Sequence, residues 1–140
     1  MFKDLADNLE KHRETVLIVD DDLMVLQLGQ EVLNLYGYEV LTASSEEEAL
    51  EIHASADNRI ALAILDLTLS GGREGLEIAK VLRSHDPAIK TIISSGFDLS
   101  CEALDQFESI VDTYLYKPYE MHALAGEVER LLAERAKEVG

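Results

Sequence analysis

Hydrophobic residues along the chain gather in five short runs that are separated by longer amphipathic stretches. The runs cover residues 16–19, 38–43, 60–65, 89–94 and 110–116. The amphipathic stretches cover about residues 23–36, 45–56, 76–83, 97–109 and 120–137. Short apolar runs are typical of buried strands, and apolar residues repeated every three or four positions are typical of helices. Strand and helix alternate five times, which predicts a doubly wound α/β fold with a parallel sheet and helices on both faces.

Local signals mark the ends of several predicted helices. Ser45 and Glu48 have the spacing of a capping box, and Gly37 follows the first helix as a stop. The apolar face of that first helix is predicted to consist of Val25, Leu28, Val32 and Leu35. The last helix is predicted to turn five residues inward: Met121, Leu124, Val128, Leu131 and Leu132.

Acidic side chains follow two of the predicted strands. The first run ends in three consecutive aspartates, Asp20, Asp21 and Asp22, and the third run ends in Asp66. By itself the triplet also fits a solvated loop in which Asp22 caps the next helix. If the two strands are parallel neighbours, their ends lie about 5 Å apart, and Asp66 joins Asp20 and Asp21 in one pocket. A multivalent cation would offset the repulsion among these carboxylates, so the pattern predicts a cation site at the carboxyl edge of the sheet.

Length and composition narrow the class of protein. With 140 residues the chain supports one domain, and residues 1–14 form an arm or a short helix before it. No apolar stretch approaches the roughly 20 residues of a membrane helix, and Cys101 is the only cysteine, so we expect a cytoplasmic protein. The net charge of -16 argues against partners such as nucleic acid or anionic lipid.

Two further polar residues follow predicted strands. Ser95 stands at the end of the fourth strand and Lys117 at the end of the fifth. Three acids, a hydroxyl and an amine at successive strand ends form a coherent phosphoryl-transfer site. The acids can hold Mg²⁺, while Lys117 can neutralise one phosphoryl oxygen and Ser95 can donate a hydrogen bond to another. One of the carboxylates would be the nucleophile, since an aspartate can form an aspartyl phosphate.

In combination these motifs resemble the receiver domain of response regulators in two-component signalling. The resemblance covers about Thr15 to Leu132, and the pattern of the loop after Asp66 looks like that of receivers attached to hybrid histidine kinases. It implies a flavodoxin-like fold with the strand order 2-1-3-4-5 and a receiver domain at residues 15–137. Two positions depart from the usual family pattern. Ser70 replaces a common proline, and Gly75 lies one position later than usual, so the loop from Ser70 to Gly75 is one residue longer.

The resemblance also implies roles for individual residues. Asp66 would accept the phosphoryl group and would ligate Mg²⁺ together with Asp21 and the backbone carbonyl of Thr68. Asp20 would act through a metal-bound water. Lys117 corresponds to the family's invariant lysine, which precedes a cis-prone proline.

Two residues would transmit the signal. Ser95 corresponds to the switch serine or threonine of the family, and Tyr114 corresponds to its aromatic switch residue. Phosphorylation would change the surface formed by the fourth helix, the fifth strand and the last helix.

These features favour a phosphorylatable switch over an enzyme. A sensor histidine kinase or a histidine phosphotransfer protein would donate the phosphoryl group, and an unknown downstream protein would bind the altered surface. The only reactions expected are self-phosphorylation and slow autodephosphorylation. No output domain follows Gly140, so a single-domain regulator is expected.

The alternatives are the receiver module of a hybrid histidine kinase, a metal-dependent phosphohydrolase with Asp66 as nucleophile, and a scaffold that is never phosphorylated. Thr68 stands where such a hydrolase usually carries its general acid, and the acidic, hydroxyl and lysine positions argue against a scaffold.

Overall fold

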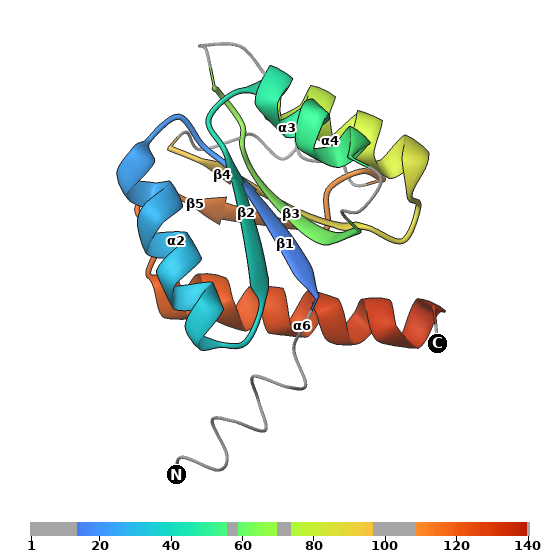
Figure 1. Ribbon diagram of the computed structural model, residues 1–140. Coiled ribbons are helices and arrows are strands. Elements are labelled where there is room, and N and C mark those ends of the chain that lie inside the picture. The colour runs from blue at the N-terminus through green and yellow to red at the C-terminus, as the bar shows by residue number, and fades with distance from the viewer. Residues whose placement is uncertain (1–13, 56–58, 70–73, 97–108, 140) are drawn as a thin grey trace, which may run out of the picture.

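The predicted five-stranded parallel sheet is confirmed. The computed structural model describes residues 14–55, 59–69, 74–96 and 109–139. Within them the strands are β1 (Thr15–Val19), β2 (Glu39–Ala43), β3 (Ile60–Asp66), β4 (Lys90–Ser95) and β5 (Thr113–Tyr116). Their order is β2-β1-β3-β4-β5, and each neighbouring pair is parallel, as the resemblance implies (Figure 1).

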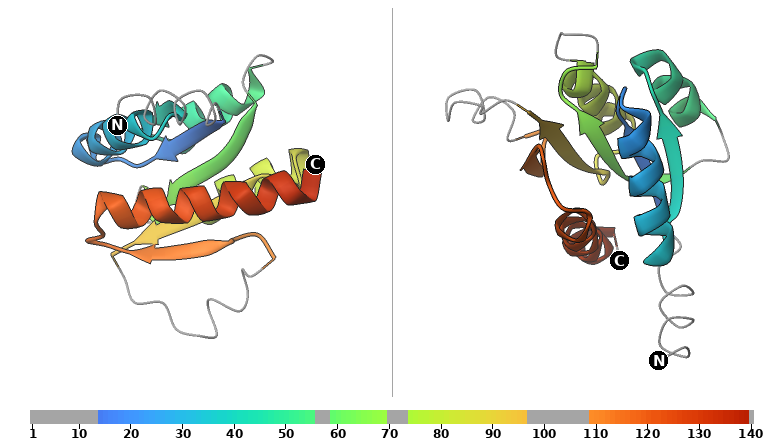
Figure 2. Two further views of the ribbon diagram at one scale, coloured as in Figure 1. Left: turned by 90° about the horizontal axis from the view of Figure 1, so that it is seen from below. Right: turned by 90° about the vertical axis from the view of Figure 1, so that its left-hand side faces the viewer.

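Helices cover both faces of this sheet. They are α2 (Leu23–Leu35), α3 (Glu46–Ala54), α4 (Glu74–His85) and α6 (Met121–Val139). Figure 2 shows α2 and α6 on one face of the sheet and α3 and α4 on the other. Within the described residues, no helix combines the length and the apolar character that are needed to cross a bilayer.

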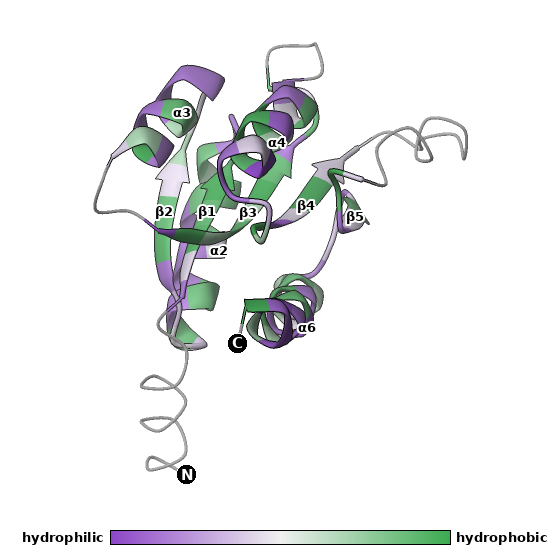
Figure 3. Cartoon of the chain, turned by 90° about the vertical axis from the view of Figure 1, so that its right-hand side faces the viewer, coloured by the Kyte–Doolittle hydropathy of each residue, from purple (hydrophilic) through white to green (hydrophobic). Residues whose placement is uncertain are grey.

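The core forms two layers because successive residues of a strand point to opposite faces. In β1, Leu17 and Val19 pack toward α3 and α4, whereas Val16 and Ile18 pack toward α2 and α6. β3 is the central strand of the sheet, and all seven of its residues are buried. Figure 3 shows the hydrophobic residues concentrated along the central strands, while the helices carry both hydrophobic and hydrophilic residues.

The predicted apolar face of the first helix is wrong at Leu28 and Leu35, whereas Val32 packs against the core and Val25 is half-buried. In α2 the buried residues are Leu26, Gly29 and Leu33, whereas Leu28 is 43% exposed and Leu35 is 66% exposed. Gly29 explains the orientation, because a Cβ at this position would lie 2.8 Å from the side chain of Ile18. The missing side chain lets α2 lie close to β1. The other helix signals hold, since Ser45 caps α3 and Gly37 has a positive φ of 95° after α2.

Other predicted boundaries differ by a few residues. The strand expected to begin at Ile110 begins at Thr113, because a turn occupies Ser109 and Ile110. Of the inward set predicted for α6, four residues are buried and Met121 is partly buried. Residues 1–13, the loop at 70–73 and nearly all of the helix predicted at 97–109, with Cys101, lie outside the described residues.

Candidate phosphoryl-transfer site

Three carboxylates meet at the carboxyl edge of the sheet. Asp20 follows β1 and Asp66 ends β3, and the residues before them, Val19 and Leu65, are register partners. One oxygen each from Asp20, Asp21 and Asp66 lies within 4.8 Å of the others. Asp20 is 1% exposed and Asp66 is 5% exposed, whereas Asp21 faces solvent. The structure therefore brings together the three acids that the strand pattern predicted.

Asp22 has a separate role. Its side chain accepts a hydrogen bond of 3.0 Å from the backbone N–H of Met24 and forms the N-cap of α2. Its own N–H donates to Asp20 Oδ1 at 2.9 Å. The capping role expected for Asp22 is thus confirmed. Asp22 begins the helix, while Asp20 and Asp21 belong to the pocket.

Lys117 completes the pocket. Its ammonium group donates to Asp20 Oδ2 at 2.9 Å and lies 3.5 Å from Asp66 Oδ2. The backbone places it there, because the Lys117 N–H donates to the Ser95 carbonyl at 2.7 Å. The peptide bond between Lys117 and Pro118 is cis. One cation therefore contacts two of the three carboxylates.

The electrostatics of the pocket oppose a fully charged Asp66. Burial raises the pKa of its carboxyl group, and the nearby charge of Asp20 raises it further, whereas Lys117 and the Thr68 N–H lower it. Burial alone would lower the pKa of Lys117, but the hydrogen bond to Asp20 and the two acidic charges outweigh it and raise that pKa. The pocket thus holds excess negative charge that one lysine only partly offsets, which is the setting in which a divalent cation binds.

The backbone around Asp66 is closely packed. The Leu67 N–H donates to the Ser94 carbonyl at 2.8 Å, and the Thr68 N–H donates to Asp66 Oδ1 at 3.4 Å. A Cβ on Gly75 would lie 2.3 Å from the backbone oxygen of Asp66, so only glycine fits where α4 begins. Thr68 lies two residues after Asp66, in the segment between β3 and α4.

Ser95 and Tyr114 lie on the same face of the sheet. Ser95 is buried at the end of β4, and Tyr114 is half-buried in β5. Tyr114 pairs with Ile93, two residues before Ser95, so their side chains point to the same side. Tyr114 packs against the core layer that includes α3 and α4.

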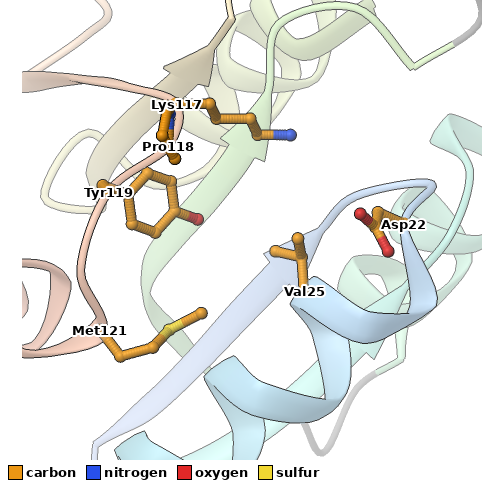
Figure 4. A pocket seen from close by; sticks show the side chains of 6 residues that line it. All are labelled: Asp22, Val25, Lys117, Pro118, Tyr119 and Met121. Atoms are coloured by element: carbon orange, nitrogen blue, oxygen red, sulfur yellow. The ribbon is translucent and has the colours of Figure 1, made fainter.

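A cleft of about 350 Å³ adjoins the acid pocket. Its lining residues come from the start of α2 and from the segment between β5 and α6: Asp22, Val25, Lys117, Pro118, Tyr119 and Met121 (Figure 4). Burial raises the pKa of Tyr119, so its phenol stays protonated at neutral pH. Tyr119 is not among the site residues predicted from the sequence. Its position directly after Lys117-Pro118 was the available signal.

Comparison with known proteins identifies the class. The family model for the response regulator receiver domain matches residues 16–129. The chain belongs to this family. It is 32% identical over 120 residues to the transcriptional regulatory protein PrrA of Mycobacterium tuberculosis, covering 86% of this chain and 50% of PrrA. It is 29% identical over 125 residues to the response regulator MprA of Mycobacterium sp. (strain KMS), covering 89% of this chain and 53% of MprA. The chain thus spans about half the length of these curated relatives.

Solved structures agree with this assignment. A CheY-like receiver domain protein from Methanospirillum hungatei JF-1 superposes with a TM-score of 0.80 at 27% identity, covering 90% of this chain and 98% of that protein. The response regulator TrrA from Thermotoga maritima, solved in complex with Mg(2+)-BeF, superposes with a TM-score of 0.72 at 30% identity, covering 84% and 98%. The family resemblance drawn from the sequence motifs is confirmed.

Proposed function

We propose that this chain is a phosphorylation-dependent switch whose receiver unit spans residues 15–137 and whose phosphoryl acceptor is Asp66. A sensor histidine kinase or a histidine phosphotransfer protein in the cytoplasm would be the donor. The observation that carries the proposal is the ion pair of 2.9 Å between Lys117 and Asp20 directly beside a buried Asp66. This arrangement places the carboxylates and the ammonium group that phosphoryl transfer needs side by side at one edge of the sheet.

The residues present fit a Mg²⁺ ion. Mg²⁺ prefers oxygen ligands and keeps several waters, which suits two carboxylates and one carbonyl. We assign Asp21, Asp66 and the Thr68 carbonyl as direct ligands and Asp20 as a ligand through water. When bound, the ion would neutralise charge on the transferred group. Lys117, 3.5 Å from Asp66 Oδ2, would hold a phosphoryl oxygen on that carboxylate.

Ser95 and Tyr114 would convert phosphorylation into a change of surface. Ser95 stands at the end of the strand beside Asp66, where its hydroxyl would donate to a new phosphoryl oxygen. Tyr114 lies on the same face and would change rotamer as Ser95 moves. Such a pair is a two-state element that one new charge can bias. The altered surface would include β5 and α6. The net charge of the whole chain, -16, favours a basic or apolar protein partner over nucleic acid or membrane.

Two arrangements of the whole protein fit this role. The chain would act by protein contact as a single-domain regulator, or as the receiver module of a hybrid histidine kinase. PrrA and MprA are about twice as long as the region they share with this chain. In either arrangement the self-phosphorylation chemistry is the same, and we propose no further enzymatic turnover.

Intact-mass spectrometry tests the acceptor. Acetyl phosphate with Mg²⁺ should add one phosphoryl group to the wild type and none to Asp66→Asn. The matched control is Asp22→Asn, because Asp22 adjoins the pocket and asparagine also caps helices. This control should be labelled like the wild type. Equal labelling of Asp66→Asn would overturn the assignment, and continuous release of phosphate would point to a phosphohydrolase instead.

Chemical-shift mapping tests the switch. Beryllofluoride, a phosphoryl mimic, should shift the amide signals of β5 in the wild type. In Ser95→Ala these shifts should be smaller, while acetyl phosphate still labels Asp66. Unchanged β5 signals in the wild type would show that the signal leaves by another face.

A further inference from the structure

Two histidines from neighbouring helices meet far from the acid pocket. His53 lies in the last turn of α3, and His85 ends α4. Their ring centroids are 5.3 Å apart, and the ring planes are inclined by 73°. Both helices begin at the carboxyl edge of the sheet and end at its opposite edge, where β3 and β4 start (Figure 1). The pair is therefore separate from Asp20, Asp21 and Asp66.

Each histidine has one ring nitrogen that it can offer to a ligand. The Nδ1 atom of His85 lies 2.9 Å from the Val81 carbonyl oxygen. A carbonyl only accepts, so this Nδ1 carries the hydrogen and leaves a lone pair on Nε2. Such a backbone contact is the usual way in which a metal-binding histidine is oriented. The Nδ1 atom of His53 is buried and has no hydrogen-bond partner among the described residues.

The charges around the two imidazole rings favour a bound metal cation. Two helix carboxyl termini meet here, each with a partial negative charge, and Asp86 follows directly. Burial lowers the pKa of His53, and His85 lowers it further, although Asp86 opposes this. An imidazole that is neutral at pH 7 keeps its lone pair for a metal.

We propose that His53 and His85 together bind a borderline divalent metal ion, such as Zn²⁺, through one nitrogen each, and that the ion links α3 to α4. Imidazole suits Zn²⁺, Ni²⁺ and Cu²⁺, whereas Mg²⁺ prefers oxygen. Two imidazoles held by Zn–N bonds of about 2.0–2.1 Å have their centroids about 5 Å apart, close to the observed separation. Within the described residues, the aspartate pocket is the only cluster of three or more potential ligands. The remaining positions on the ion would therefore belong to water, which makes the site weaker than a structural zinc site.

A zinc titration in excess Mg²⁺ tests the proposal, because Mg²⁺ would compete with Zn²⁺ for the aspartate pocket. Calorimetry and imidazole ¹⁵N shifts would be recorded for the full chain. Zn²⁺ should bind with micromolar affinity, shift the ring nitrogens of His53 and His85, and raise the melting temperature. His53→Gln and His85→Gln keep polar side chains of similar size, and each should weaken binding at least about tenfold.

Two other histidines provide controls. His122 contacts the Tyr36 hydroxyl at 3.3 Å on the other face of the sheet, and His12 lies outside the described residues. His122→Gln and His12→Gln should bind Zn²⁺ like the wild type. Wild-type affinity in both His53→Gln and His85→Gln, or no saturable binding by the wild type, would overturn the proposal.

Discussion

Lys117 and Asp20 are 97 residues apart in the sequence, and they form an ion pair of 2.9 Å that joins the end of β5 to the end of β1. Asp20 is almost fully buried, and this ammonium group is its counter-charge. The same ammonium group lies 3.5 Å from Asp66 Oδ2. The stability of the pocket and its affinity for a cation are therefore coupled through one side chain.

Replacing Lys117 by methionine should destabilise the metal-free protein, because Asp20 is left buried without a counter-charge. Lys117 is partly exposed, so we expect a loss of about 2 kcal/mol, as for a charged hydrogen bond, and not the roughly 3–5 kcal/mol of a fully buried pair. Mg²⁺ should restore most of the loss and should bind more tightly than to the wild type. Calorimetric titration and thermal unfolding with and without Mg²⁺ measure both effects.

The matched control is Lys80→Met. Lys80 is exposed and lies 3.6 Å from Glu77, so its loss should change stability by less than about 1 kcal/mol and leave Mg²⁺ affinity unaltered. If Lys117→Met melts like Lys80→Met without metal, the ion pair does not stabilise the fold.

Asp66→Asn should raise the melting temperature of the metal-free protein. Burial and the charge of Asp20 both disfavour an ionised Asp66, and asparagine removes that charge while keeping an oxygen for the Thr68 N–H. Lys117 keeps its contact with Asp20. In Mg²⁺ the order should reverse, since only the wild type gains full binding energy. A variant that melts below the wild type at every Mg²⁺ concentration would contradict the proposed repulsion.

Much of the site could be predicted because its residues stand at strand ends. The run from Ile60 to Asp66 is wholly apolar before its acid, and β3 has the predicted bounds. The strand order implied by the family resemblance makes β1 and β3 neighbours, and Asp66 then lies beside Asp20. The pairing of Lys117 with Asp20 could not be predicted, because it depends on how the chain turns after β5. The sequence pattern only placed Lys117 at the same edge.

The orientation of α2 shows a second limit. Its apolar residues form two overlapping stripes, one through Leu26 and Leu33 and one through Leu28 and Leu35. Counting apolar side chains favours the second stripe, because Gly29 adds nothing to the first. The structure buries the first stripe, since close approach of the helix to Ile18 requires a residue without a side chain.

Alanine substitutions at Leu33 and Leu35 test this orientation. Leu33 is 0% exposed and Leu35 is 66% exposed, although both are leucines near the end of α2. Leu33→Ala should cost about 2–5 kcal/mol, because it leaves a cavity in the core. Leu35→Ala should change stability by less than about 1 kcal/mol. Chemical denaturation measures both values, and equal losses would contradict the orientation described here.

Alkaline pH should destabilise the protein through Tyr38. Burial, followed by the charges of Glu129 and Glu14, raises the pKa of this phenol from 10.0 to about 12. Because the folded-state pKa is the higher one, the unfolded chain loses its proton first. The stabilising contribution is therefore complete below pH 10 and is lost as the pH rises toward 12. Melting temperatures recorded across this range should fall more steeply for the wild type than for Tyr38→Phe, and parallel curves would exclude Tyr38 as the cause.

Gly75→Ala should disturb the acceptor itself. The new Cβ would lie 2.3 Å from the Asp66 oxygen and 2.9 Å from the Asp66 carbonyl carbon, and these backbone atoms cannot move aside without shifting the end of β3. We expect the free energy of unfolding to fall by about 1–3 kcal/mol, as for an overpacked core, together with slower labelling by acetyl phosphate.

Gly126→Ala is the matched control, because Gly126 lies in α6 with no atom within 4 Å of the added Cβ. Alanine there should stabilise the helix by up to about 1 kcal/mol and leave labelling unchanged. If Gly75→Ala is labelled at the wild-type rate and melts like Gly126→Ala, the contact between α4 and Asp66 does not position the acceptor.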